Sequence, residues 1–219
     1  MLSRFSIPFE ELPVELSIFP LQNILLLPYG RLPLNIFEPR YVNMVLEALG
    51  EGRMIGIVQT LEATTDPVPD DALLCNTGCV GRIIAFSEVP ENRIFITLHG
   101  LCRFNITSEH SIVNGYRRVH SDFSPYKTDM DIRQQPLVTD ELTRLFRDYF
   151  EVEKLQVDWS EIKKINDQQL LANLTMMCPF DSREKKALIE ARDIDHMVEI
   201  LTTLMEMAVK SSHKYSIKN

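Results

Sequence analysis

The chain has 219 residues and a formal net charge of −8. This negative charge repels phosphate backbones and argues against nucleic acid as a partner. Hydrophobic residues make up 45% of the chain, which is enough to bury a core, and the length allows one domain with a helical annex or two small domains.

The N-terminal segment does not read as a secretory signal. It carries Glu10, Glu11 and Glu15 where such a signal needs an uninterrupted apolar stretch. No window approaches the roughly 18 apolar residues of a membrane span. We therefore expect a cytoplasmic protein without a membrane partner, and we expect reduced thiols at its cysteines, Cys75, Cys79, Cys102 and Cys178.

The first part of the chain reads as strands and turns around one helix. Apolar runs over residues 15–28 and 31–37 predict strands, and their prolines place them at sheet edges, bends or strand starts. From Pro39 the apolar spacing becomes helical until Gly50, which predicts a helix. Residues 53–60 return to strand, and a polar, proline-containing loop follows.

A β-hairpin is predicted over residues 79–106, with a turn around residues 89–92. Its register stays open. A three-residue loop with Asn92 in the left-handed conformation pairs Val89 with Arg93, whereas a longer loop shifts the pairing by one residue and exchanges the faces. Apolar residues occur on both faces of the hairpin, which favours strands inside a closed or two-layered sheet.

Helical patterns dominate after residue 126. Amphipathic runs predict helices over residues 137–154, 160–178, 181–193 and 193–210. Asp181 and Glu184 have the spacing of a capping box, which places a helix start there. The sequence thus predicts an α+β fold with a β-rich domain over 1–126 that contains one helix, followed by a helical bundle over 127–219.

Most enzyme signatures are missing from the sequence. No glycine is followed by lysine, and no G-x-G-x-x-G, G-x-S-x-G or H-E-x-x-H occurs, which argues against phosphate-binding loops, nucleophile elbows and helical zinc-hydrolase sites. The histidines are scattered along the chain. We expect no catalytic residues and no cofactor.

One metal site remains as an alternative to buried free thiols. Cys75 and Cys79 lie near the start of the hairpin, and His99 and Cys102 lie near its end. The longer-loop register would place Cys79 and Cys102 on the same face, and tetrahedral zinc takes four such nitrogen and sulfur ligands. Small apolar thiols inside strands explain the same pattern.

Several motifs in order resemble the N-terminal, substrate-binding domain of Lon proteases. They are "IFPLQNILLLPYGRLPLNIFEPRYVNMV", "GRMIGIV", "GCVGRIIAFSEVPENRIFITLHGLCRFNI" and "GYRRV", and "LLANLTMMCPFDSREKKALIEARDIDHMVEIL" is similar to the helical extension of that domain. The resemblance covers the chain from Leu16 to about Leu204. It implies a PUA-like β pseudo-barrel followed by a helical bundle.

The resemblance also implies a function. It suggests a non-enzymatic module that recognises polypeptide segments or a partner protein, because 219 residues hold neither the ATPase nor the protease module of Lon proteases. Whether it works with an ATP-dependent protease or a chaperone stays open. Two alternatives remain: RNA binding by analogy with PUA domains, and a small enzyme with an unrecognised site.

The expected peptide site is a groove between barrel and bundle, lined by apolar side chains and a few arginines. Its candidate residues are Phe37, Arg40, Tyr41, Arg82, Arg103 and Phe104. Each also has a structural interpretation. Tyr41 and Phe104 suit the core, and Arg40 and Arg103 suit ion pairs with acids such as Glu38.

Overall fold

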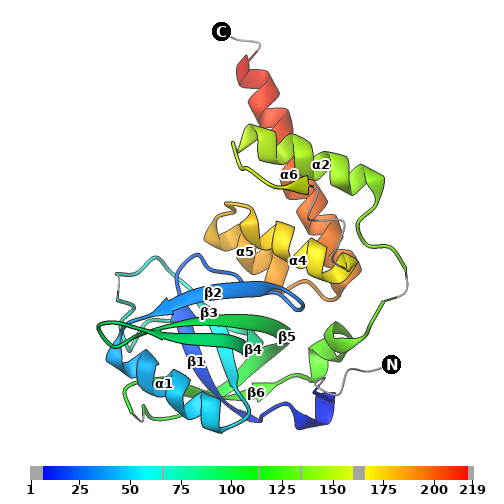
Figure 1. Cartoon of the computed structure of the whole chain (residues 1–219). Coiled ribbons are helices and arrows are strands. Elements are labelled where there is room, and N and C mark those ends of the chain that lie inside the picture. Colours follow the sequence, from blue (N-terminus) through cyan, green and yellow to red (C-terminus); the bar gives the residue numbers. More distant parts are fainter. Residues whose placement is uncertain (1–6, 66, 113, 134, 160–165, 217–219) are drawn as a thin grey trace.

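The structure is a computed structural model that describes residues 7–65, 67–112, 114–133, 135–159 and 166–216. Figure 1 shows a strongly curled sheet with helix α1 on one side of it. The later helices form a layer against another side of the sheet, and α6 extends away from it together with α2. The fold is therefore mixed α/β.

Six strands make up the sheet: β1 (Glu15–Leu21), β2 (Arg31–Ile36), β3 (Met54–Thr60), β4 (Leu74–Val89), β5 (Arg93–Glu109) and β6 (Arg117–Asp122). Their order is β2-β5-β4-β3-β1-β6, and β5 also pairs with β6. The sheet curls back on itself because the second half of β5 reaches β6 while its first half pairs with β2 and β4.

The strand-to-helix corner predicted around Pro39 is confirmed. Strand β2 ends at Ile36, and α1 (Pro39–Gly50) begins with Pro39 in its first turn, where a missing N–H costs nothing. The strand predicted over 15–28 is partly wrong, because β1 ends at Leu21. The following leucines, Leu25 to Leu27, are buried in a loop instead, and Tyr29 in that loop has a φ of 65°.

The hairpin has the register of the three-residue loop. Val89 pairs with Arg93, and Glu91 and Asn92 both have positive φ. Register shifts between Val80 and Gly81 and between Ile83 and Ala85 bend the long strands, as closure of the sheet requires.

Helices follow the short 3-10 helix η2 (Ser124–Met130), and another 3-10 helix, η1, spans Phe9–Glu11. They are α2 (Asp140–Val152), α4 (Asp167–Met177), α5 (Ser182–Ile189) and α6 (Ile194–Ser216). The capping box of Asp181 and Glu184 is confirmed at the start of α5. The helix predicted over 160–178 is present as α4, and residues 160–165 lie outside the described part of the chain.

The core has two sets of buried side chains. The first lies inside the curled sheet and includes Val80, Cys102 and Phe104. The second joins the other face of the sheet to α1 and to the later helices, so strands and helices pack on one another. The domain boundary at residue 126 stays a prediction. None of the helices within the described residues combines the length and apolarity needed to cross a membrane.

Candidate functional site

Arg40 and Tyr41, predicted as binding residues, have structural contacts. The Arg40 guanidinium pairs with Glu38 at 2.8 Å and with Asp70, and it donates a hydrogen bond to the Val68 carbonyl oxygen at 2.7 Å. Tyr41 is buried, with its ring 4.1 Å from that of Phe19, and burial raises the pKa of its hydroxyl to about 12. The predicted ion pair between Arg40 and Glu38 is therefore confirmed.

Arg103 and Phe104 lie next to each other on β5 but face different surroundings. Arg103 is 2% exposed, and its guanidinium contacts both carboxylate oxygens of Asp129, at 2.8 and 2.7 Å. Phe104 is fully buried inside the curled sheet, where Gly56 and Gly78 leave room for its ring. A Cβ at Gly78 would lie 2.8 Å from that ring, so glycine is needed there.

A cavity of about 290 Å³ lies between η2 and the helices α4 and α6. Its wall includes Arg103, Arg133, Ala172 and Met197, and of the six candidate residues only Arg103 lines it. Both arginines in this wall are already paired, Arg103 with Asp129 and Arg133 with Asp195. Both cationic side chains of the cavity wall are therefore neutralised within the protein.

Phe37 lies elsewhere, at the end of the sheet where β2, β5 and the tip of the hairpin meet. We call this surface the apolar sheet end and define it by Phe37, Ile84, Phe86 and Phe95, whose exposed fractions are 58%, 47%, 51% and 48%. The register places them on both faces of this end, because Phe86 shares a face with its partner Ile96, whereas Phe95 shares the other face with its partners Ser87 and Asn35. No other described phenylalanine is exposed.

The outer edge of β4 is open along the same surface. Strand β3 pairs with β4 as far as Arg82, one of the predicted site residues, and the Ile83 amide donates its hydrogen bond to the Arg53 carbonyl oxygen. From Ile84 to Val89, the pairing within the described chain is with β5 alone. An edge strand with exposed apolar side chains is a template for another strand.

Sequence reasoning did not find Ile84, Phe86 and Phe95. The prediction that the whole hairpin lies inside a closed or two-layered sheet is right for the buried positions 77–81 and wrong for positions 84–88, which are exposed. The sequence feature that could have indicated an exposed apolar surface is the presence of apolar residues on both faces of the hairpin near its turn. Only the start of β3 at Met54, opposite Arg82, shows that residues 84–88 of β4 extend beyond the neighbouring strand.

The alternative zinc site is wrong. Cys79 is paired with Arg103 and Cys102 with Val80, so the two thiols point to opposite faces of the hairpin and lie in different parts of the core. Burial raises the pKa of both thiols, which opposes formation of the thiolate that binds metal. His99 and Cys75 do not join either thiol, because the His99 ring packs near Tyr29 and the Cys75 thiol donates to the Thr60 carbonyl oxygen.

Comparison with known proteins agrees with this architecture. The family model described as "ATP-dependent protease La (LON) substrate-binding domain" matches residues 15–207. A Lon N-terminal domain protein from Xanthomonas campestris has a similar fold, with a TM-score of 0.58 and 20% identity over 86% of this chain and 97% of that one.

Curated relatives are much longer than this chain. The Lon protease of Haemophilus influenzae is 23% identical over 87% of this chain, which spans 24% of that protein. The Lon protease of Flavobacterium johnsoniae is 34% identical over 44% of this chain and 12% of its own length. The match over residues 15–207 and the shared fold show that this chain belongs to the family of Lon substrate-binding domains.

Proposed function

We propose that this chain binds extended polypeptide segments at the apolar sheet end, by adding a strand to the open edge of β4. The carrying observation is that the open strand itself carries the exposed Phe86, while the exposed Phe95 lies on the neighbouring β5, on the opposite face, where it is paired with Ser87 of β4. Strand addition supplies main-chain hydrogen bonds that do not depend on sequence, which suits a module that recognises many polypeptides.

Side chains of the bound segment would alternate between the two faces of β4. On one face they would meet Phe86, and on the other they would lie over Ala85 and Ser87. Those two side chains are small, so the ring of Phe95, which is paired with Ser87, stays accessible across the edge strand. Glu88 is exposed on the same strand, so we expect a preference for apolar segments flanked by basic residues.

The six residues predicted from the sequence take different parts in this proposal. Phe37 contributes directly as an exposed side chain of the surface. Arg40 and Tyr41 hold the start of α1, just after Phe37, and Arg82 is paired with Met54, where β3 begins. Arg103 and Phe104 act further away, through the cavity wall and the core.

We also propose that the chain recognises polypeptides without hydrolysing them or ATP, and that it acts in the cytoplasm. The family match supports this, since it is to a substrate-binding domain, and no P-loop lysine follows any glycine of the sequence. Its four cysteines are buried free thiols, as expected in a reducing compartment.

The predicted PUA-like pseudo-barrel over 1–126 and the helical bundle over 127–219 are retained as proposals. The pairing of β5 with both β4 and β6 supports the first. The packing of α6 against α2 and α5 supports the second. A truncated chain that ends at residue 126 would test whether the β-rich part folds alone.

Fluorescence anisotropy tests the peptide proposal, with a labelled, reduced and carboxymethylated protein as the unfolded probe. We expect saturable binding that weakens about fivefold or more in Phe86→Ser and in Phe95→Ser, since buried aromatic contacts at interfaces contribute more than about 1 kcal/mol. Leu46→Ser is the matched control, because Leu46 is 54% exposed on α1. Equal affinity of all four proteins, or no binding by the wild type, would overturn the proposal.

A further inference from the structure

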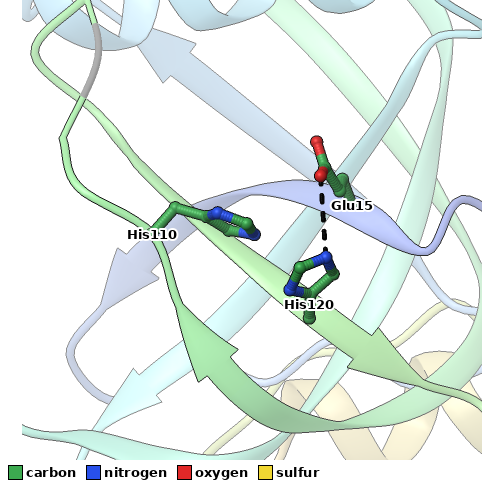
Figure 2. A group of neighbouring side chains, drawn as sticks. All are labelled: Glu15, His110 and His120. Atoms are coloured by element: carbon green, nitrogen blue, oxygen red, sulfur yellow. Dashed lines mark ion pairs between the residues drawn. The ribbon is translucent and has the colours of Figure 1, made fainter.

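Three potential metal ligands meet on one face of the sheet where it closes. Glu15 on β1 is paired directly with His120 on β6, and His120 is paired with Ser108 on β5. His110 lies two positions after Ser108, and its amide donates a hydrogen bond to the Arg118 carbonyl oxygen, which keeps it beside β6. Figure 2 shows the two imidazole rings side by side, with Glu15 above them.

The donor atoms of this group are close together. One ligand atom from each of Glu15, His110 and His120 lies within 4.8 Å of the others. Oε1 of Glu15 and Nε2 of His120 are 3.6 Å apart, and the two ring centroids are 4.3 Å apart. Ligands of a tetrahedral zinc ion with bonds near 2.0 Å are about 3.3 Å apart, so small side-chain movements would bring the three atoms into place.

A second observation points to a ligand. Nε2 of His110 is buried and has no hydrogen-bond partner, although buried polar atoms are almost always paired. Nδ1 of His120 lies 3.1 Å from Oγ of Ser108. When Nδ1–H donates to this hydroxyl, the lone pair of His120 lies on Nε2, toward Glu15, in the way that outer hydrogen bonds orient metal-binding histidines.

We propose that Glu15, His110 and His120 bind a zinc ion. Two imidazole nitrogens and one carboxylate are a ligand set that zinc accepts, and the fourth position would face solvent because Glu15 and His120 are partly exposed. The nearby Arg118 does not compete for Glu15, since its guanidinium pairs with Glu47. The net charge of −8 also favours a cation.

The ion would have a structural effect. Glu15 lies on β1, His120 lies on β6 and His110 directly follows β5, so the ion would link the strands that close the sheet. A ligand that binds the folded state and not the unfolded one raises the free energy of unfolding. Zinc should therefore raise the melting temperature of this protein, and it should do so only through these three side chains.

Equilibrium dialysis of chelator-treated full-length protein against zinc chloride, followed by elemental analysis, measures the site. We expect one zinc ion per chain and a rise in melting temperature. Glu15→Gln, His110→Asn and His120→Asn should each weaken binding by more than about tenfold, and Ser108→Ala by about tenfold. Magnesium should not compete, because it prefers oxygen ligands.

Two matched controls separate this site from other side chains that bind zinc weakly. Glu11→Gln makes the same chemical change at an exposed acid of η1, and His196→Asn makes it at a histidine of α6. Both should keep the wild-type affinity and the zinc-dependent rise in melting temperature. The proposal is overturned if the wild type binds no zinc. It is also overturned if the wild type binds zinc no more tightly than Glu15→Gln and His120→Asn do. Circular dichroism spectra of these two variants, compared with that of the wild type, check that both are folded.

Discussion

Arg103 and Asp129 form a buried ion pair that connects the sheet to the helices. Side chains of the two residues are 3% and 5% exposed, and Asp129 also accepts a hydrogen bond from the Arg103 amide at 3.0 Å. The same guanidinium donates to the carbonyl oxygens of Ile189 and Ala191, at the end of α5. Burial alone would lower the pKa of Arg103, but the hydrogen bonds and charge of Asp129 outweigh it and raise that pKa.

Replacement of Asp129 should therefore be costly. Asp129→Asn leaves the Arg103 charge buried without a counter-charge, and we expect the free energy of unfolding to fall by about 3–5 kcal/mol. Urea denaturation measures this change. Asp195→Asn is the control, because the Arg133–Asp195 pair is partly exposed and should contribute no more than about 1 kcal/mol. Similar losses in both variants would contradict the assigned role.

Gly100 should not tolerate a side chain. A Cβ at this position would lie 2.0 Å from the Leu27 carbonyl oxygen, in a region where the Gly100 amide donates to the Gly30 carbonyl oxygen. We expect Gly100→Ala to destabilise the protein by about 2 kcal/mol or more, because backbone must move. In Gly50→Ala the new methyl group meets nothing within 4 Å, so stability should change by less than about 1 kcal/mol. Equal melting temperatures for the two variants would refute this explanation.

His99 should make stability depend on pH. Burial and the charge of Arg31 lower its pKa in the folded state below the ordinary value of 6.5. The unfolded chain therefore binds more protons, and stability that is fully present above about pH 6.5 is lost as the pH falls toward the folded pKa. Between about pH 7.5 and 5.5, the free energy of unfolding should fall more in the wild type than in His99→Gln. Parallel pH profiles would show that His99 does not contribute.

Arg40 should control the loop that follows β3. Its contacts with Asp70 and Val68 tie this loop to the start of α1. We expect Arg40→Gln to speed amide hydrogen exchange in residues 67–73 while the strands keep their protection. Arg93→Gln is the control, since Arg93 pairs with the exposed Glu91 at the hairpin tip. Unchanged exchange in the loop would mean that other contacts hold it.

Interactions between neighbouring residues were sufficient to predict where several helices begin. Pro39 starts a helix because its ring fixes φ and it lacks the N–H that the first turn leaves unpaired. Asp181 and Glu184 start another because each satisfies a free backbone amide of the same turn. These interactions join residues a few positions apart, so the order of residues contains all the information they need.

The tertiary structure determines which side chains are exposed and which lie close together at the candidate sites. The register of the hairpin separates Cys79 from Cys102, and the start of β3 at Met54, which is paired with Arg82, leaves Phe86 beyond the last residue of β4 that β3 covers. Neither follows from spacing, because a shift of one residue exchanges the faces of a strand and bulges shift it again.

By itself, the sequence determined the family, the order of the elements and most of their ends, since these depend on neighbouring residues. Closure of the sheet determined which distant side chains meet, as Glu15 and His120 do across β1 and β6. Strands that are far apart in the sequence pair because the whole core packs favourably. The free energy of that packing does not come from any short segment of the chain.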